Sequence, residues 1–523
     1  MRRAFTVATA AVLTLTLAAP ADARAAGAGP GSAGIGDSYY PLYGNGGYDA
    51  AHYDVRLRYH HDQGRLTGTT TMLATATQDL NRFNLDFALD VQSVRVNDRP
   101  AAFVREQGRE LIVTPAKEIR SGERLNVVVT YDDRPATKVV DGHVGWKATR
   151  DGVTMLGEPE AALWWFPSND HPTDKATFDV SVQVPERLAA LSNGLQNGPP
   201  TQPIAGWKRW SWRNDLPTAT YLQFLMIGDY EIVTDEINGL PSINAYHKDL
   251  GPALPAAKAS IERTAEIVEW ESSLLGPYPF HTLGGIAGPS DGFRSALEVQ
   301  GRPYYGPGFW SRGSNTSVVV HELAHQWFGD SVSVKDWRDI WLNEGWATYL
   351  EWLWSERNGE GTAQELSDYA YVKEPVDSAF WQVMPGDPGA SDLFHRAVYN
   401  RGAMTVHQLR LALGDEKFFH FVQEWQKTHK YGVGTITEFQ QAASVAAGRD
   451  LGPMFRTWLF TKGRPAAPQA HRATPAEPRS WQRIAEAHEQ VHQHEDLGRT
   501  HHGHDHHGHD HHGHAHGHAG HQH

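Results

Sequence analysis

The hydrophobic pattern of this chain changes its period near Leu240 and Pro241, and this change constrains the fold more than any other feature. Before it, the segments 53–59, 125–131 and 178–184 are strand-like: the first and third alternate apolar and polar residues, and the second is a more continuous apolar run. After it, apolar residues recur every three to four positions, as in amphipathic helices. We therefore predict a multidomain α+β protein, in which an all-β unit at residues 39–236 precedes a mainly helical unit at residues 237–462.

Helices are predicted at about residues 256–275, 316–329, 339–357, 400–413 and 437–447. The chain has 523 residues, of which 40% are hydrophobic, so it can bury a large core. The formal net charge of −14 argues against the basic stripe that nucleic-acid binding requires. No nucleic-acid partner is therefore expected.

The first 23 residues have the composition of an export signal. Two arginines follow Met1, residues 4–19 are apolar, and Ala21-Asp22-Ala23 provides a small-x-small cleavage site. The apolar run is shorter than the roughly 20 residues that a membrane-spanning helix needs. We expect cleavage near Ala23, a flexible leader at residues 24–38, and a secreted, extracellular protein without stable membrane insertion.

A five-residue motif predicts a metal site. The chain contains no cysteine, so histidines and carboxylates must supply any ligands. The segment from His321 to His325 reads His-Glu-x-x-His, and positions four apart lie on one helix face, roughly 6 Å apart. His321 and His325 can therefore reach one Zn²⁺ at about 2.0–2.1 Å, with Glu322 beside the ion as a base for an activated water. Two histidines on an apolar helix are also often only packed, so the motif alone leaves both interpretations open.

A third ligand favours a catalytic zinc. Glu344 follows on the next predicted helix, among Trp341, Leu342 and Trp346, which indicate a buried position. A buried carboxylate needs a cation as partner. Two histidines and one glutamate leave a coordination position for water, which is the arrangement of catalytic rather than structural zinc.

The string 321–344, which ends in Asn343-Glu344-Gly345, resembles the zinc signature of the aminopeptidase N family of zinc metallopeptidases, the gluzincin aminopeptidases, which include the leukotriene hydrolase. The likeness extends from the β unit to Trp458. It implies a saddle-like β domain, a thermolysin-like zinc catalytic domain, and peptide substrates with a free N-terminus. It also implies a short bacterial-type secreted form, because a linker and a tail take the place of the family's helical C-terminal domain.

The resemblance also implies roles for further residues. Segment 295–300 occupies the place of the family's Gly-Ala-Met-Glu-Asn signature and matches it at Ala296 and Glu298, which implies that Glu298 binds the substrate's α-amino group. Segment 157–161 resembles the part of the N-domain that reaches the family's active site. We align Glu160 with the second amine-binding carboxylate. Glu158 stays an alternative, because the spacing from Glu160 to the family landmark at residues 166–172 is shorter than usual.

Segment 398–403 resembles the family's Tyr-x-Lys-Gly sequence, with Arg401 in place of the lysine. The resemblance implies that Tyr399 donates its hydroxyl proton to the oxyanion of the tetrahedral intermediate. Taken together, these residues predict a secreted zinc aminopeptidase with Glu322 as general base. The alternatives are an endopeptidase or an epoxide hydrolase on the same scaffold, or a non-enzymatic secreted protein that sequesters metal.

The C-terminal part of the chain has a different composition. Residues 463–480 are rich in Ala, Pro and Arg and are predicted to be a linker. From His488 to the end, 16 of 36 residues are histidine, in repeats such as His501-His502-Gly503-His504-Asp505. A short helix is predicted at 481–493, within a segment 481–523 that is otherwise expected to be disordered. Clustered imidazoles predict weak binding of further Zn²⁺, Ni²⁺ or Cu²⁺ ions, for capture or delivery.

Overall fold

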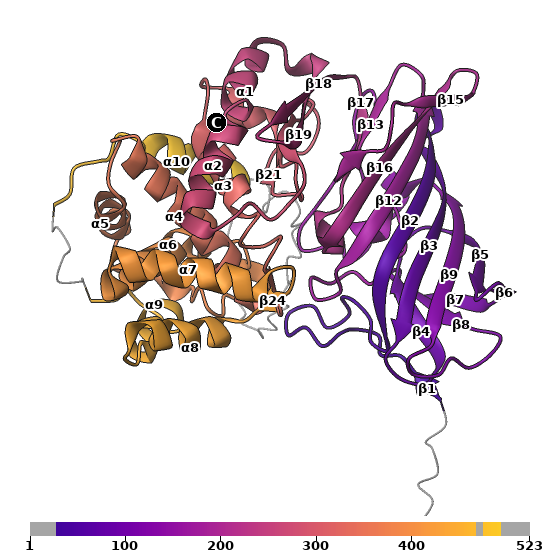
Figure 1. Cartoon of the computed structure of the whole chain (residues 1–523), viewed down its shortest axis with the longest axis horizontal. Coiled ribbons are helices and arrows are strands. Elements are labelled where there is room, and N and C mark those ends of the chain that lie inside the picture. Colours follow the sequence, from indigo (N-terminus) through magenta and orange to yellow (C-terminus); the bar gives the residue numbers. More distant parts are fainter. Residues whose placement is uncertain (1–27, 467–473, 493–523) are drawn as a thin grey trace, which may run out of the picture.

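The computed structural model describes residues 28–466 and 474–492. This part of the chain forms two units that lie side by side, a β unit and a helical unit, on the right and left of Figure 1. The order of the units confirms the predicted fold class. No described helix is long and apolar enough to cross a membrane. The predicted export signal and the histidine repeats lie outside the described residues and stay predictions.

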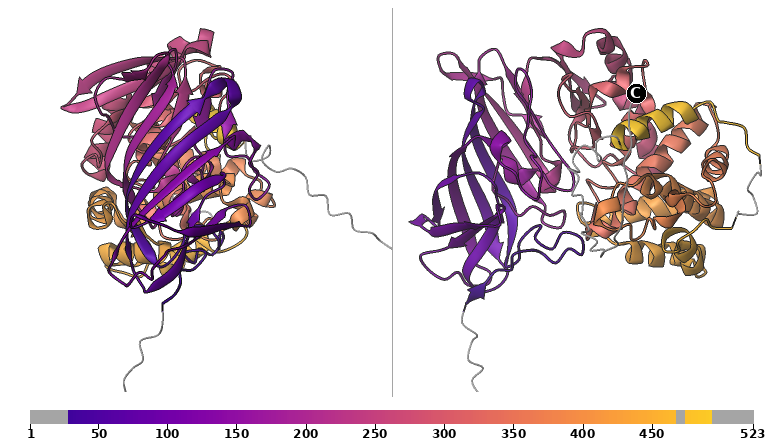
Figure 2. Two further views of the ribbon diagram at one scale, coloured as in Figure 1. Left: turned by 90° about the vertical axis from the view of Figure 1, so that its right-hand side faces the viewer. Right: turned by 180° about the vertical axis from the view of Figure 1, so that it is seen from behind.

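The β unit is built around a twisted nine-stranded sheet, which the left panel of Figure 2 shows obliquely. Its strands pair in the order β14 (Leu195–Gln196), β16 (Trp207–Thr218), β12 (Ala176–Pro185), β2 (Tyr48–His60), β3 (Arg65–Ala76), β9 (Arg124–Asp133), β5 (Val91–Val96) and β6 (Arg99–Pro100), with β15 (Thr201–Ile204) on β16. The three segments predicted as strands lie inside β2, β9 and β12. In β12 every second residue is buried, which is the alternation that predicted it.

Two four-stranded sheets complete the β unit. One pairs β1 (Gly29–Pro30), β4 (Leu80–Asp86), β8 (Glu110–Thr114) and β7 (Ala102–Glu106), and the other pairs β10 (Lys147–Ala148), β11 (Val153–Met155), β17 (Leu225–Gly228) and β13 (Ala189–Leu191). Their apolar side chains share one core with the large sheet. The loop between β10 and β11 carries Asp151, which takes part in the contacts described below.

A five-stranded sheet joins the two units. It pairs β18 (Tyr230–Ile237), β19 (Leu240–His247), β20 (Leu283–Ala287), β22 (Tyr304–Tyr305) and β21 (Ala296–Leu297), in that order. Side chains on one face, such as Ile243, belong to the core of the β unit, and those on the other, such as Tyr246, belong to the helical core. The predicted boundary at 236–237 is therefore wrong: it falls inside the β18–β19 hairpin, because strand periodicity alone does not reveal a change of sheet.

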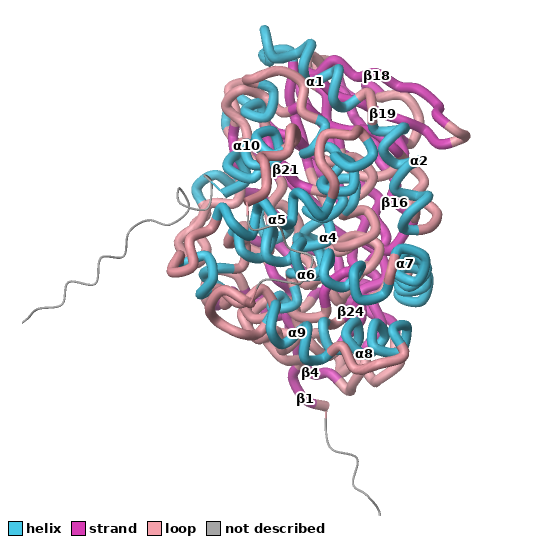
Figure 3. The backbone as a smooth tube through the Cα atoms, turned by 90° about the vertical axis from the view of Figure 1, so that its left-hand side faces the viewer, coloured by secondary structure: helices cyan, strands magenta, loops and turns pink. Residues whose placement is uncertain are grey.

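The helical unit contains α1 (Leu254–Ile261), α2 (Thr264–Leu275), α3 (Thr316–Ala324), α4 (Trp341–Arg357), α5 (Ala363–Lys373), α6 (Arg396–Leu413), α7 (Asp415–His429), α8 (Ile436–Ala447), α9 (Gly452–Leu459) and α10 (Trp481–His492). Figure 3 labels these helices except α3. A short pair of strands, β23 (Ser333–Val334) and β24 (Val433–Gly434), lies among them. All the predicted helices are present, although the first is split into α1 and α2. Helices α5, α7 and α9 were not predicted. The nearly fully buried α4 lies at the centre and packs against α3, α5 and α6.

Two predictions for the ends of the chain need correction. The segment 24–38, predicted to be a flexible leader, takes part in the fold from Gly29 on: Asp37 is buried and accepts a hydrogen bond from the backbone N of Trp337 at 2.8 Å. The segment 481–523, predicted to be disordered apart from a short helix, begins with α10. This helix packs against α3, and Trp481, Ile484 and Ala487 enter the helical core.

Candidate active site

Four polar side chains of the candidate site meet where helices α3 and α4 face one another. His321 on α3 and His325, one residue beyond its end, are four positions apart and share a face. Glu344 and Glu351 on α4 are seven positions apart, about two helical turns, so both point towards α3. Since α3 and α4 pack directly together, all four side chains meet in the interior of the helical unit.

His321, His325 and Glu344 have the geometry of a metal site. The Nε2 atoms of His321 and His325 lie 3.2 and 3.5 Å from the same Glu344 oxygen. Ligand atoms around a tetrahedral zinc with bonds of about 2.0–2.1 Å are separated by roughly 3.3 Å, so the spacing fits. The donor set of two imidazoles and one carboxylate is also the set that catalytic zinc uses.

The remaining imidazole nitrogens fix the tautomers that a metal requires. Nδ1 of His321 lies 2.8 Å from Glu351 Oε1, and Nδ1 of His325 lies 2.9 Å from the carbonyl oxygen of Phe328. Each Nδ1 therefore donates its proton outward, which leaves the Nε2 lone pairs directed at the shared centre. Glu351 was not predicted as a site residue, although its position two turns after Glu344 could have revealed it.

Electrostatics support the same assignment. Burial would raise the pKa of Glu344, but the charge of His325 and the hydrogen bonds of both histidines lower it to about 2. Burial, together with the negative charges of Glu298 and Glu344, raises the pKa of Glu322 to about 8, although both histidines oppose the shift. Glu298 and Glu158 also have raised pKa values, because their carboxylates are withdrawn from solvent and lie near other carboxylates of the site. This concentration of buried acidic groups calls for positive charge in the pocket.

A pocket of about 200 Å³ opens over the three candidate ligands. Its walls include five further site candidates or neighbours: Glu158, Glu298, Glu322, Phe394 and Tyr399. Carboxylate oxygens of Glu298 and Glu322 and a ring nitrogen of His325 lie within 4.8 Å of one another. The structure thus brings together every predicted site residue except Glu160.

Glu160 has a different environment, which corrects its alignment with the amine-binding position. Its Oε2 lies 2.6 Å from the guanidinium of Arg109, a buried side chain that also contacts Asp141 at 2.8 Å and packs over the ring of Tyr43. Glu160 therefore neutralises a buried cation inside the β unit. Glu158, the alternative considered from the sequence, is the carboxylate that the β unit brings to the pocket.

Gln326 holds the backbone around Glu298. Its Nε2 donates to the Glu298 carbonyl at 2.9 Å, and its Oε1 accepts from the backbone N of Gly301 at 2.7 Å. One side chain next to the metal ligand His325 thus fixes both ends of the Glu298 loop. This contact positions a loop whose sequence departs from the family signature in three of five places. Sequence reasoning missed Gln326, because only the tertiary contact reveals it.

Glycines allow the helix that carries Tyr399 to approach the metal site. Where α4 and α6 cross, a Cβ on Gly402 would lie 3.0 Å from the Cα of Gly345, closer than real Cβ contacts normally come. Both positions therefore require glycine for this crossing. The close approach places the Tyr399 ring over the ring of His321, with centroids 5.9 Å apart and planes 21° apart. Both glycines belong to the motifs that predicted the site.

Arg401, which replaces the lysine of the family's motif, points away from the pocket. Its buried guanidinium donates to backbone carbonyls at the C-terminal end of α9 and in the turn Ala379–Gln382, including those of Trp458 at 2.7 Å and Trp381 at 3.2 Å. A planar guanidinium can serve several carbonyl acceptors at once, which an ammonium group does less well. Arg401 thus ties helix α6 to the C-terminal end of α9.

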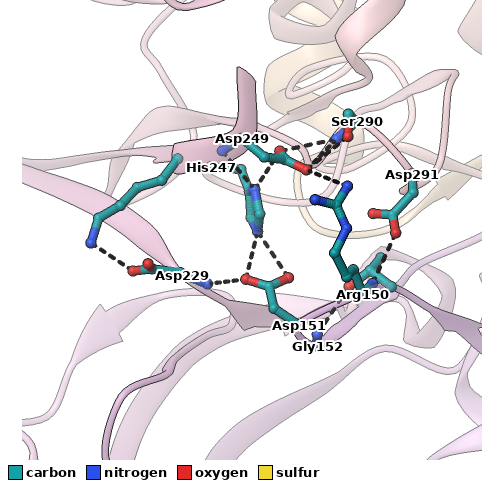
Figure 4. Close-up of polar contacts among 10 residues, drawn as sticks. Arg150, Asp151, Gly152, Asp229, His247, Asp249, Ser290 and Asp291 are labelled. Carbon is teal, nitrogen blue, oxygen red and sulfur yellow. Dashed lines mark hydrogen bonds and ion pairs between the residues drawn. The ribbon is translucent and has the colours of Figure 1, made fainter. Parts of the chain in front are cut away.

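A polar network ties the β unit to the segment that leads into the pocket (Figure 4). His247 at the end of β19 contacts Asp249 through Nδ1 at 2.6 Å and Asp151 of the β unit through Nε2 at 3.2 Å. Asp249 also accepts hydrogen bonds from the backbone N and the hydroxyl of Ser290, at 3.1 and 2.7 Å. Ser290 shortly precedes the pocket residues Phe293 and Ser295, so the network fixes the approach to β21.

Two family models match the chain, and together they cover more than half of it. The model of the peptidase family M1 domain matches residues 310–458, and that of the peptidase M1 N-terminal domain matches residues 49–222. The first range contains the three candidate metal ligands, and the second contains Glu158. The chain belongs to peptidase family M1. The predicted resemblance is therefore confirmed.

Individual relatives of this M1 protein are distant in sequence. A probable aminopeptidase 2 of Sulfurisphaera tokodaii is 27% identical over 60% of the chain and 42% of its own length. An aminopeptidase N of Streptomyces lividans is also 27% identical, over 57% of the chain and 36% of its own length. The chain thus spans less than half of the length of these curated relatives.

Among solved structures, an M1 zinc metallopeptidase from Deinococcus radiodurans matches with a TM-score of 0.73 and 29% identity, over 85% of the chain and 100% of its own. A mutant of that enzyme, bound to a Tyr-Ser-Ala substrate, matches with the same values. The two-unit architecture of the M1 protein therefore has a complete counterpart. Since that counterpart is a zinc metallopeptidase, the donor geometry and the family agree on the metal.

Proposed function

We propose that this M1 protein is a zinc-dependent aminopeptidase that removes the N-terminal residue from peptides with a free amino terminus. The observation that carries the proposal is the meeting of two carboxylates, Glu298 and Glu158, with the three metal ligands in one pocket. A peptide's α-ammonium group between these carboxylates would be anchored next to the metal. The names of the relatives, which include aminopeptidases, support the same reaction.

The charges of the pocket are consistent with this substrate. Glu298, Glu322 and Glu344 are buried around it and Glu158 is half-buried, and the raised pKa values of Glu158, Glu298 and Glu322 show that their surroundings disfavour the charged forms. A dication at the ligands and an ammonium at Glu158 and Glu298 would restore those charges. A peptide with a blocked amino terminus would bring no cation to Glu158 and Glu298.

The catalytic groups can be assigned from their positions. A zinc ion at His321, His325 and Glu344 would supply Lewis-acid activation of water and of the scissile carbonyl. Glu322 accepts the proton of the attacking water and returns it to the leaving amine, as a carboxyl with a pKa raised to about 8 can do. A cation nearby would lower that pKa towards neutrality.

Tyr399 and the strand β21 complete the assignment. Tyr399 lines the pocket beside His321, from where its hydroxyl would donate to the developing oxyanion. Strand β21 is the edge strand of its sheet, and its two residues also line the pocket. A bound peptide would therefore lie along β21, with its amino terminus at Glu298.

The experiment that tests the proposal compares a short peptide carrying a free amino terminus with its N-acetylated form. The free peptide should be cleaved at its first bond with a kcat/KM at least about tenfold higher, because only it can pair with the buried carboxylates. Chelation followed by zinc addition controls for metal dependence. Equal cleavage of both peptides, or cleavage at internal bonds, would identify an endopeptidase instead.

We also propose that the histidine repeats beyond the described residues bind Zn²⁺, Ni²⁺ or Cu²⁺ and deliver zinc to the site. A truncation that removes the repeats must spare α10, because this helix belongs to the core of the helical unit. Truncation after His492 keeps α10. At limiting zinc, we expect the metal-free enzyme truncated after His492 to regain activity several-fold more slowly, since tethered ions raise the local concentration. Equal reactivation rates of the full and truncated chains would refute delivery.

A further inference from the structure

Helix α10 lies beyond the residues that the M1 models match and packs against α3, which carries His321, while single side-chain contacts join it to α4, which carries Glu344. At the N-terminus of α3, the Asn315 side chain caps the helix and also donates to the Arg483 carbonyl at 3.2 Å. At the end of α4, the hydroxyls of Ser355 and Ser480 are hydrogen-bonded at 2.6 Å. The helix is therefore anchored at both α3 and α4; it is drawn in yellow in the right panel of Figure 2.

The buried face of α10 ends in a histidine. Trp481, Ile484, Ala487 and His488 recur at helical spacing, and all four are buried. His488 Nε2 lies 2.7 Å from Glu351 Oε1, the same oxygen that Nδ1 of His321 approaches at 2.8 Å. The His488 ring lies 5.9 Å from the ring of His321 and 5.8 Å from that of Tyr399. A side chain from outside the family domains thus reaches the neighbourhood of the metal centre.

The distances decide what kind of contact this is. His321, Glu351 and His488 could also be regarded as a second metal site, since their donor atoms lie within 4.8 Å of one another. Donors around one tetrahedral zinc would be roughly 3.3 Å apart, as in the trio with Glu344. The separations of 2.7 and 2.8 Å are instead those of charge-assisted hydrogen bonds. The three side chains form a hydrogen-bonded chain that ends at a metal ligand.

Glu351 depends on these two donors. Its side chain is fully buried, and its other oxygen has no hydrogen-bond partner within the described parts of the chain. A carboxylate this deeply buried is strongly destabilised unless N–H groups satisfy it. Loss of one donor would destabilise the ionised form of Glu351 and leave its carboxylate less firmly oriented. The hydrogen bond that orients His321 would then weaken.

We infer that His488 is a positioning residue of the metal centre: it donates to Glu351, which in turn orients the metal ligand His321. The inference rests on the zinc site of the proposed function, but not on the choice of substrate. It also means that the metal centre is completed by a helix from a segment whose composition predicted disorder. Partners that hold a metal ligand typically contribute tenfold to a hundredfold in metal affinity.

The test compares variants that differ in one N–H group. Met and Gln have similar size, but only Gln can donate, so His488→Met should raise the Kd for zinc about tenfold and His488→Gln should stay near the wild-type value. Zinc affinity is measured by competition with a chelator of known affinity. Glu489→Ala, at the exposed neighbouring position on α10, serves as a control and should leave the Kd unchanged.

His488→Phe keeps the ring and lacks the donor, and it replaces the Met variant if that protein does not fold. Wild-type zinc affinity in a folded variant without the donor would overturn the inference, and so would an equal loss in the Gln variant. Failure of the proposed function would show differently: the wild-type protein would bind zinc at His321 without preferring free amino termini, and the order of the zinc affinities would still hold.

Discussion

Replacing Glu322 with Gln is expected to lower kcat by at least about a hundredfold and to leave zinc binding at the wild-type level. The amide has the size of the carboxylate but cannot accept the proton of the attacking water. Glu322 is not one of the three ligands, whose donor atoms form their own cluster on α3 and α4. Measured kcat and the zinc content of the purified protein check the two halves of this expectation.

Glu322→Asp is the matched control. It keeps the carboxylate but withdraws it by one methylene, so kcat should fall less than in the Gln variant. A loss of zinc in either variant would show that Glu322 acts as a ligand, which its proximity to Glu298 and His325 allows. Near-normal turnover in the Gln variant would disprove its role as the base.

The metal ligands could be predicted because local helix geometry determines most of their arrangement. His321 and His325 are four positions apart, and this spacing alone places them on one face. Glu344 lies on a different helix, so its position relative to the histidines does not follow from local geometry. The apolar residues around it, however, indicate that this helix is buried. The zinc trio therefore depends on one helix–helix contact, which the two motifs jointly imply.

The Glu160 alignment was wrong because no periodicity describes the segment around it. Residues 156–161 are irregular in the structure, so the direction of each side chain follows from tertiary contacts rather than from its position in a repeat. Two carboxylates two positions apart then look equivalent in the sequence. They are distinguished by the buried Arg109, which forms an ion pair with Glu160, whereas Glu158 lines the pocket.

The role of α10 was hidden for a related reason. Its helical pattern was recognised, but the histidines that follow it made the whole segment resemble a disordered tail. Whether a short amphipathic helix docks depends on a complementary surface, which here consists of α3 and the turn Pro307–Trp310 and is not encoded locally. His488 therefore belongs by composition to the repeats and by position to the metal centre.

The second large effect is expected at the carboxylates that anchor the amine. Glu298→Gln and Glu158→Gln should each lower kcat/KM for a peptide with a free amino terminus by about tenfold to a hundredfold. A hydrogen bond to a charged group contributes roughly 1.5–3 kcal/mol, which corresponds to that range. Cleavage of the N-acetylated peptide, already slow, should not decline further. Steady-state kinetics with both peptides measure the ratio directly.

Glu160→Gln is the decisive comparison, because sequence alignment and structure assign different roles to this residue. The preference for free amino termini should be unchanged in this variant, and Tm should fall because Arg109 loses its closest carboxylate. A preference that falls here and survives in Glu158→Gln would contradict this assignment of the two carboxylates. In the double variant of Glu158 and Glu298 no carboxylate of the pair remains, so free and acetylated peptides should be cleaved at nearly equal rates. An M1 protein that still selected free amino termini without both side chains would have to recognise them elsewhere in the pocket.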